Sequence, residues 1–281
     1  MTGTAMTGTV TRFLAAAFLC IAAARAEAVE LTLQGNFTQG GLVFAQTVPG
    51  ATVSLDGKPL RLTPDGRFIF GFTRDAAPEA TLTVTAPGGT VETRALEVAQ
   101  RDYDIQRIDG IQQDYVSPPP EVLARIRADA EAAARARELD RPETDFDSGF
   151  IWPAAGPISG VYGSQRILNG EPRQPHYGVD IAGPVGTPVK APADAVVTLA
   201  HPDMYFSGAT LIMDHGHGLS SSFLHLEKIL VQEGQRVKQG EVVALMGKSG
   251  RVTGAHLDWR MNWFEQRIDP TLLVPPMPTG E

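Results

Sequence analysis

The N-terminal part of the chain alternates hydrophobic and polar positions with a period of two. Side chains of a strand point to its two faces in turn, so this alternation predicts strands with one buried face. The segments with this pattern are residues 31–33, 42–44, 52–55, 68–72 and 81–85. Asp-Gly and Pro-Gly-Gly sequences between them mark tight turns, at which glycine accepts a positive φ. Short strands at this spacing predict a small immunoglobulin-like β-sandwich over residues 29–110.

A helical connection is predicted for residues 111–149. Ser117 is followed by three prolines, which break the preceding structure and offer a helix start. Residues 121–139 are rich in Ala, Arg and Glu, and this composition favours a helix. Their large hydrophobic side chains are confined to the first turns, so we expect a spacer that lies on a surface rather than a core helix.

Residues 150–281 again show the pattern of strands joined by glycine-rich turns, and the whole chain is predicted to be mainly β. Residues 186–192 and 231–241 resemble the hairpins of lipoyl and biotinyl carrier domains. A carrier needs a lysine in a characteristic sequence at an exposed hairpin tip, and neither Lys190 nor Lys248 has one. The hairpins therefore indicate an architecture and not a covalently attached cofactor.

The first 28 residues are predicted to be a cleavable signal peptide. Arg12 provides the positive charge, residues 13–24 the hydrophobic stretch, and residues 24–26 the cleavage site. The hydrophobic stretch is too short to span a bilayer, and no later segment is long enough, so we expect no membrane span after cleavage. We expect export to the periplasm or the cell exterior, with Cys20 removed together with the signal peptide.

The overall composition narrows the function without naming it. A hydrophobic fraction of 43% and a charged fraction of 20% are typical of a globular protein with a full core. The formal net charge of −8 argues against nucleic acid as a partner, because non-specific binding to phosphates needs a basic surface.

Two short stretches offer the groups that a metal site on a sheet requires. His176 and Asp180 stand four residues apart in an extended segment, and His256 and Asp258 stand two apart in another. Residues of equal parity share one face of a strand, so each stretch presents its two groups to the same side. His225 lies between the two stretches in the sequence Phe-Leu-His-Leu. The spacing therefore predicts a mononuclear metal site.

These residues resemble the M23 family of zinc metallopeptidases, the lysostaphin-like enzymes that cut the peptide cross-links of bacterial cell walls. The family pattern is H-x-x-x-D, then a histidine in an H-L context, and then H-x-H. The resemblance covers residues 150–274 and includes the segment 163–173 ahead of His176. The one departure is Asp258, which stands where the family has the second histidine of H-x-H.

The resemblance implies an M23-type antiparallel sheet for the C-terminal domain and a bound Zn²⁺. By this resemblance, His176, Asp180 and Asp258 would hold the zinc. His225 and His256 would be the catalytic residues that handle the proton and stabilise the tetrahedral intermediate. The implied partner is the peptide stem of peptidoglycan.

Asp258 leaves two functional hypotheses open. A carboxylate is a legitimate zinc ligand, so the chain is expected to be a zinc endopeptidase that acts on peptidoglycan cross-links. Some members of the family have lost metal ligands and instead activate cell-wall amidases, so the alternative is a non-catalytic partner or scaffold. Arg260 shares the parity of Asp258, and it would either restore positive charge at the site or draw the carboxylate away from the metal. A regulatory protein partner is compatible with both hypotheses.

Overall fold

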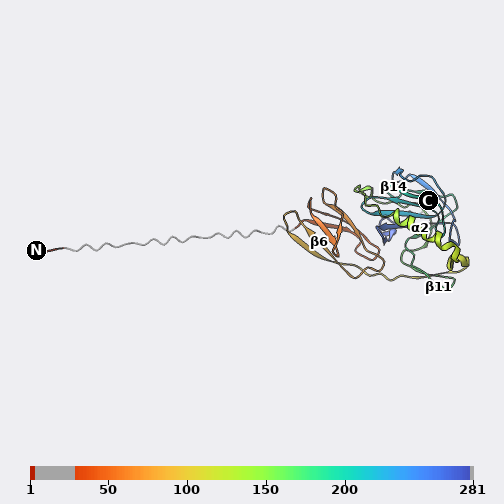
Figure 1. Cartoon of the computed structure of the whole chain (residues 1–281), viewed down its shortest axis with the longest axis horizontal. Helices are drawn as coiled ribbons and strands as arrows, with labels where there is room; N and C mark the ends of the chain where they lie inside the picture. Colours follow the sequence, from red (N-terminus) through yellow and green to blue (C-terminus); the bar gives the residue numbers. More distant parts are fainter. Residues whose placement is uncertain (4–28, 279–281) are drawn as a thin grey trace.

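The computed structural model of the chain describes residues 1–3 and 29–278 (Figure 1). Residues 4–28 of the predicted signal peptide, including Cys20, lie outside this range. None of the helices in the described residues is both long and apolar enough to cross a membrane. The described part is mainly β and its sheets are largely antiparallel, which confirms the predicted fold class.

The N-terminal region forms two antiparallel sheets, with strand orders β1-β2-β5 and β4-β3-β6-β7. The strands are β1 (Leu31–Gly35), β2 (Leu42–Thr47), β3 (Thr52–Leu55), β4 (Lys58–Leu60), β5 (Arg67–Gly71), β6 (Glu79–Thr85) and β7 (Val91–Glu97). Phe70 of the first sheet and Leu82 of the second are fully buried in the same hydrophobic core. Asp56 and Gly57, both at positive φ, form the tight turn between β3 and β4 that the Asp-Gly signal predicts. The immunoglobulin-like type of this region stays a prediction.

The C-terminal region is built on one large sheet in which the sequential strands pair antiparallel. Its main strand order is β17-β14-β15-β16-β19-β12-β9, with β13, β18 and β20 paired at its margins. The strands are β9 (Ile158–Gly160), β12 (Val179–Ala182), β13 (Pro188–Lys190), β14 (Ala195–Met204), β15 (Gly208–Asp214), β16 (Leu219–Ile229), β17 (Arg236–Val237), β18 (Val242–Met246), β19 (His256–Trp263) and β20 (Gln266–Ile268). The central strands carry the large buried side chains Leu211, Phe223 and Trp259.

The predicted spacer helix is present and lies against the C-terminal sheet. A short helix α1 (Gln113–Val116) and a 3-10 turn at Pro120–Val122 lead into α2 (Leu123–Arg135). No residue of α2 is fully buried, in agreement with a helix that rests on a surface. The helix contacts β14, and a small cluster of hydrophobic side chains beneath its end includes Ile212. The α-helix ends before the predicted residue 139. The last backbone N–H groups donate to carbonyl oxygens three residues earlier, which is the tighter hydrogen-bond pattern of a 3-10 turn.

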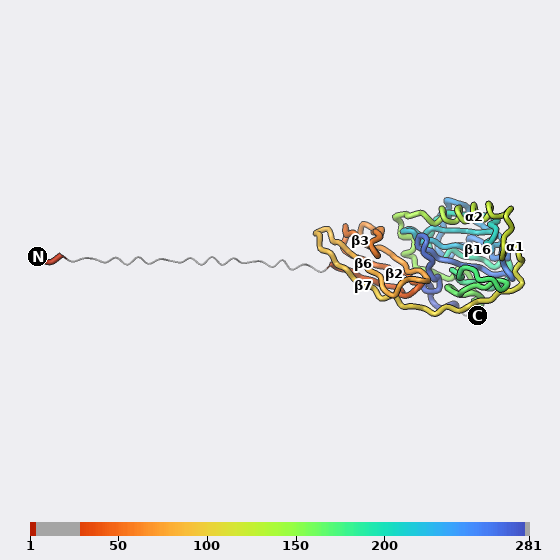
Figure 2. The backbone as a smooth tube through the Cα atoms, turned by 60° about the horizontal axis from the view of Figure 1, so that its bottom comes forward, coloured from red at the N-terminus to blue at the C-terminus, as the bar shows by residue number. Residues whose placement is uncertain are grey.

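The two regions are joined by direct contacts as well as by the chain. Figures 1 and 2 show the N-terminal sheets at one end of the molecule and the C-terminal sheet with α2 at the other. Strand β8 (Ile105–Ile108) pairs in parallel with β10 (Gln165–Leu168), and β10 pairs with β11 (Glu171–Pro172). Arg101 also forms an ion pair with Asp269 at 2.8 Å. The segment that follows the N-terminal sheets therefore packs along the C-terminal region. Through β8 it pairs with β10, the strand that carries Arg166.

Candidate metal centre

Strands β12 and β19 carry three of the predicted site residues, Asp180, His256 and Asp258, on one shared face, and His176 lies in the segment just before β12. The two strands pair antiparallel, with Asp180 directly opposite Asp258 and Ala182 opposite His256. Residues that oppose each other in such a pair point to the same side of the sheet. The intervening residues Ile181 and Leu257 are fully buried on the other side. The alternation of the sequence thus places the two carboxylates together and packs the core behind them.

His176 completes a compact group with the two carboxylates. One candidate ligand atom from each of His176, Asp180 and Asp258 lies within 4.8 Å of the others, and all three residues are buried. The Nε2 atom of His176 lies 3.0 Å from Asp180 Oδ1 and 3.5 Å from Asp258 Oδ1. Three buried ligand atoms that converge in this way fit a metal ion at their common centre.

The hydrogen bonding of these atoms also fits a metal ion. Within the described part of the chain, His176 Nε2 and Asp180 Oδ1 make no hydrogen bond of acceptable geometry although both are buried. Buried polar atoms without a partner are costly and rare in folded proteins. A cation between them would satisfy both atoms, whereas the 3.0 Å contact alone does not align them for a hydrogen bond. The donor set of one imidazole and two carboxylates suits a divalent metal such as zinc.

Charge at the site favours a cation in the same place. Burial alone would raise the pKa of Asp258, but Arg260 and His176 outweigh it and hold this pKa well below its ordinary value. Burial also favours the neutral form of Asp180, and its pKa is nevertheless lowered, mainly by His176 and Arg166. For His176, burial lowers the pKa, but Asp258 and Asp180 raise it above its ordinary value. Two ionised carboxylates therefore favour positive charge at the position between them and His176 Nε2.

Two arginines hold the outer sides of these carboxylates. Arg166 donates from Nη2 to Asp180 Oδ2 at 2.7 Å. Arg260 donates to both oxygens of Asp258, from Nε to Oδ1 at 2.9 Å and from Nη2 to Oδ2 at 2.5 Å. Such paired contacts fix the orientation of a carboxylate, as an outer partner of a metal ligand does. Oδ1 of Asp180 stays free of these arginine contacts, and Oδ1 of Asp258 faces His176 as well as Arg260.

Two glycines leave the space that the carboxylates occupy. A Cβ atom added to Gly160 of β9 would lie 2.2 Å from Asp180 Oδ2, and one added to Gly178 would lie 2.6 Å from Asp258 Oδ1. Both distances are shorter than a side chain can accept without moving the oxygen. The absence of a side chain at these two positions is therefore part of how the site is shaped.

A β-bulge brings His225 to the site. Leu224 and His225 of β16 together oppose the single residue Thr210 of β15, and His225 has a positive φ of 63°. An extra residue of this kind re-aims a side chain that strict alternation would place on the opposite face. The rings of His225 and His256 lie 4.9 Å apart between centroids. The sequence predicts the participation of His225 but not the bulge, because its signal is the residue itself and not a periodicity.

Both histidines direct Nδ1 at a backbone carbonyl oxygen. His225 Nδ1 lies 2.8 Å from the Ser249 carbonyl oxygen, and His256 Nδ1 lies 2.9 Å from the Gly254 carbonyl oxygen. A carbonyl can only accept a hydrogen bond, so each Nδ1 carries a proton, and in a neutral ring Nε2 then keeps its lone pair. Burial lowers the pKa of His225 to about 4, so this ring is neutral near pH 7. His256 Nε2 lies 3.8 Å from Asp180 Oδ1, which places the second ring beside the candidate ligands.

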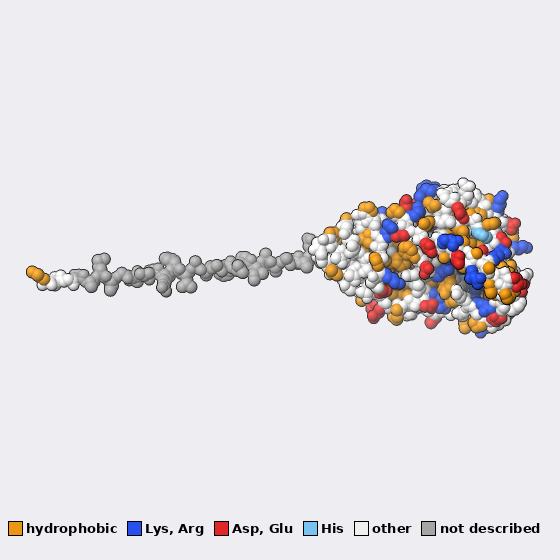
Figure 3. Space-filling model, viewed as in Figure 1, with side chains coloured by type: hydrophobic (Ala, Val, Ile, Leu, Met, Phe, Trp, Pro, Cys, Tyr) orange, Lys and Arg blue, Asp and Glu red, His pale blue; other side chains and the backbone are white. Residues whose placement is uncertain are grey.

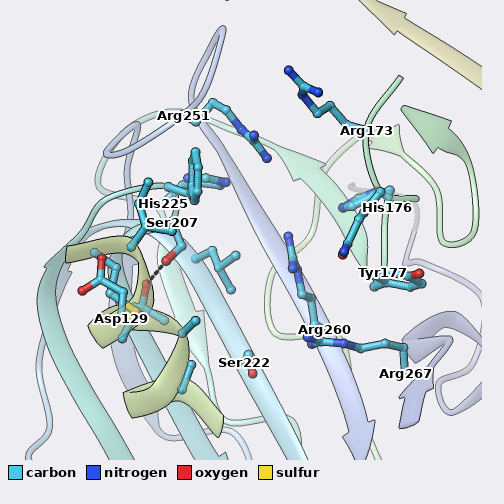
Figure 4. A pocket seen from close by; sticks show the side chains of 18 of the residues that line it. Asp129, Arg173, His176, Tyr177, Ser207, Ser222, His225, Arg251, Arg260 and Arg267 are labelled. Carbon is cyan, nitrogen blue, oxygen red and sulfur yellow. Dashed lines mark hydrogen bonds between the residues drawn. The ribbon is translucent and has the colours of Figure 1, made fainter. Parts of the chain in front are cut away.

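A cavity of about 570 Å³ opens beside this group. Figure 4 shows His176 and His225 on opposite sides of it, with Arg260 directed towards His176. Ala130 and Ala133 of α2 form part of its wall, so the segment predicted as a spacer helps to shape the cavity. The volume lies in the range of cavities that hold small molecules or short peptides.

Half of the arginines around the cavity could not be recognised from the sequence. Arg166 and Arg173 belong to the segment 163–173 and Arg260 shares the parity of Asp258, but Arg137, Arg251 and Arg267 come from segments with no such pattern. These residues lie far apart along the chain, and only the three-dimensional fold brings them to one place. No local signal in the sequence could have grouped them.

Comparison with known proteins identifies the class of the C-terminal region. Residues 174–270 match the family described as peptidase family M23, so the chain carries an M23 peptidase domain. A solved structure from Pseudomonas aeruginosa, assigned to peptidase M23, is 29% identical and superposes with a TM-score of 0.64. That match covers 84% of this chain and 94% of the other, so the N-terminal sheets are included in it.

The similarity to characterised relatives covers only part of each protein. The chain is 43% identical over 89 residues to the peptidoglycan DD-endopeptidase ShyA of Vibrio cholerae, which is 31% of this chain and 20% of the relative. It is 36% identical over 127 residues to a lipoprotein NlpD/LppB homolog of Pseudomonas aeruginosa, which is 45% of this chain and 40% of that relative. The chain thus spans less than half the length of these two relatives.

Proposed function

We propose that the chain is a zinc-dependent endopeptidase that hydrolyses peptide cross-links of peptidoglycan after export to the periplasm or cell exterior. The observation that carries the proposal is the convergence of three buried ligand atoms, from His176, Asp180 and Asp258, beside an open cavity. The M23 family match and the similarity to a peptidoglycan endopeptidase support the same substrate class. Cleavage of the predicted signal peptide would be tested by sequencing the N-terminus of the exported protein.

The residues around the candidate metal centre would have different roles in amide hydrolysis. When bound, zinc supplies Lewis-acid polarisation of a carbonyl group and lowers the pKa of water. His225 and His256 each donate from Nδ1 to a carbonyl oxygen, so the Nε2 of either neutral ring would take up a proton and return it to the leaving amine. The same rings would donate a hydrogen bond, once protonated, to negative charge that develops on the substrate oxygen.

The arginine contacts favour a second candidate, a non-catalytic partner of a cell-wall amidase. Arg166 and Arg260 already satisfy one or both oxygens of each carboxylate, so the site can hold its charges without a metal. The similarity to an NlpD/LppB homolog is compatible with this alternative. We favour the enzyme because His176 Nε2 and Asp180 Oδ1 stay without a hydrogen bond among the described residues, and a metal would satisfy them.

Metal analysis combined with digestion of cell walls separates the two candidates. The full chain without its signal peptide would be purified, its zinc content measured by mass spectrometry, and purified sacculi incubated with it. The enzyme hypothesis expects one zinc per chain and released muropeptides whose masses identify the cut bond. Zinc-free protein that leaves sacculi intact after zinc is added would contradict it and support the amidase partner.

A further inference from the structure

The cavity beside the candidate metal centre is lined by an unusual number of arginines. Its lining includes Arg137, Arg166, Arg173, Arg251, Arg260 and Arg267. Among the described residues that line it, Asp129 is the one carboxylate. The protein as a whole carries a net charge of −8, and Figure 3 shows acidic and basic side chains intermixed over the visible surface. The cavity is therefore a concentration of positive charge in an acidic protein.

Half of these arginines have a carboxylate partner. Arg166 pairs with Asp180 at 2.7 Å and Arg260 pairs with Asp258 at 2.5 Å. Arg173 pairs with Glu171. These three guanidinium groups are neutralised within the protein, so they would contribute orientation more than net charge.

The other three have no carboxylate within ion-pair distance in the part of the chain that the structure describes. These are Arg137, Arg251 and Arg267, and all three are half-buried. Arg251 donates a long hydrogen bond of 3.4 Å to the Tyr115 carbonyl oxygen, and Arg267 donates to Asn262 Oδ1 at 3.1 Å. Neutral acceptors of this kind leave most of the guanidinium donors unused.

Burial and mutual repulsion act on these three groups. Burial, followed by the charge of neighbouring arginines, lowers the pKa of Arg251 to about 10 and that of Arg267 to about 9. The pKa of Arg137 is lowered by burial and then by Arg260. Like charges held together in a partly dry cavity are relieved when an anion binds, which is why such clusters mark binding sites.

The arginines of the cavity lie on both sides of His176. Figure 4 shows Arg173 and Arg251 on one side of His176, and Arg260 and Arg267 on the other. Arg137, which follows α2, lines the same cavity. Guanidinium groups on both sides suit a ligand with more than one carboxylate, such as a short peptide.

We infer that this cavity binds the substrate peptide through its free carboxylates, with Arg251 on one side of His176, Arg267 on the other, and Arg137 in the cavity wall. The inference rests on the proposed function and makes it narrower: the chain would select anionic stem peptides and discriminate against amidated ones. Guanidinium groups suit this task because they bind carboxylates through two parallel hydrogen bonds. The three arginines would position the peptide and take no part in the bond cleavage.

A pair of matched peptides tests the inference without any mutation. The probes are the stem peptide L-Ala-γ-D-Glu-diaminopimelate-D-Ala and the same peptide with its carboxyl groups converted to amides. Binding to the full chain is measured by calorimetry after removal of metal, so that no carboxylate can bind zinc. We expect the amidated peptide to bind at least about tenfold more weakly. Equal affinities for the two peptides would overturn the inference, as would tight binding of inorganic phosphate with no binding of the peptide.

Variants then assign the effect to the arginines. Arg251→Gln and Arg267→Gln should each lower the affinity for the anionic peptide by roughly tenfold and leave the affinity for the amidated peptide nearly unchanged. Arg135→Gln is the matched control, because Arg135 is exposed and lies outside the cavity lining. Thermal melting identifies any variant that has lost its fold. Equal losses for both peptides in folded variants would show a structural role and contradict the inference.

The outcome is distinguishable from a failure of the proposed function. If the anionic peptide binds in an arginine-dependent manner and purified sacculi stay intact, the inference stands and the enzyme hypothesis fails. If sacculi are digested and the two peptides bind with the same affinity, the enzyme hypothesis stands and the inference fails.

Discussion

The buried polar cluster around His215 and the candidate metal centre both lie at the C-terminal sheet, and they differ in how fully their atoms are hydrogen-bonded. At one cluster, His215 uses both ring nitrogens, at 2.7 Å to the Asp194 carbonyl oxygen and at 2.8 Å to Ser221 Oγ. Asp214, the preceding residue, accepts from Arg141 at 2.5 Å and from the Gly216 N–H at 3.0 Å. This cluster is closed and its groups satisfy one another.

The candidate metal centre uses the same residue types and leaves them incomplete. His176 is as deeply buried as His215, yet neither of its ring nitrogens makes a hydrogen bond among the residues the structure describes. Oδ1 of Asp180 is in the same state. Satisfied buried networks stabilise a fold, whereas unsatisfied ones are kept where a ligand completes them. Burial alone therefore does not distinguish His176 from His215, whereas their hydrogen bonds do.

The largest expected effect is the loss of metal and activity in Asp180→Ala. This change removes the ligand atom nearest to His176 Nε2 and leaves Arg166 without its partner. We expect zinc content to fall to background and hydrolysis of sacculi to stop. The measurements are metal analysis and muropeptide release, with circular dichroism as the check on folding. Stoichiometric zinc in the folded variant would remove Asp180 from the metal centre.

The closed cluster should respond in the opposite way to the matching change. Asp214→Ala leaves Arg141 without its principal buried partner, so we expect the free energy of unfolding to fall by about 2–3 kcal/mol. Zinc content and the KM for wall peptides should stay as in the wild type, because the cluster does not line the cavity. Denaturant unfolding measures the first quantity. A variant that keeps its stability but loses zinc would contradict the division between the two clusters.

Gly160→Ala should disturb the metal centre through space alone. The added Cβ would lie 2.2 Å from Asp180 Oδ2, so the carboxylate must rotate or shift away from Arg166. We expect zinc affinity to fall roughly 10- to 100-fold, as it does when an outer partner of a metal ligand is lost. Gly88→Ala is the control, since nothing lies within 4 Å of its added Cβ. Competition with a zinc chelator gives the affinity, and unchanged affinity in Gly160→Ala would show that the carboxylate is not held in place by this contact.

The sequence predicts the paired strands of the site well because alternation carries that information. Asp180 on one strand, and His256 and Asp258 on another, could be assigned to a common face from spacing alone, whereas His176 reaches the site from the segment before β12. The arginine cavity could not be predicted in this way. Its members come from α2, from loops and from separate strands, and their proximity depends on how these elements pack. The β-bulge at His225 could not be predicted either, because one extra residue redirects a side chain without a recognisable change in the alternation of hydrophobic and polar residues.

A last prediction concerns the pH dependence of stability in the closed cluster. Burial lowers the pKa of His215 to about 4, against an ordinary value of 6.5. Between these two pH values the unfolded chain binds a proton at this residue and the folded chain does not. Stability from this group is therefore complete above about pH 6.5 and is lost as the pH falls towards 4, by about 1.4 kcal/mol per pH unit within that window.

His215→Gln isolates this contribution because glutamine can keep a hydrogen bond to Ser221 but does not titrate. Urea unfolding of the wild type and the variant would be compared at intervals from pH 7 to pH 4.5. We expect the variant to be less stable at pH 7. As the pH falls, its unfolding should take up about one proton fewer than that of the wild type, so its free energy of unfolding should fall less steeply. His225 shares the low pKa of His215 but lies in the open cluster, so its titration is unaffected by the change and cancels in the comparison. Parallel curves for the two proteins would show that His215 titrates alike in the folded and unfolded chains, and the closed cluster would then not hold it neutral.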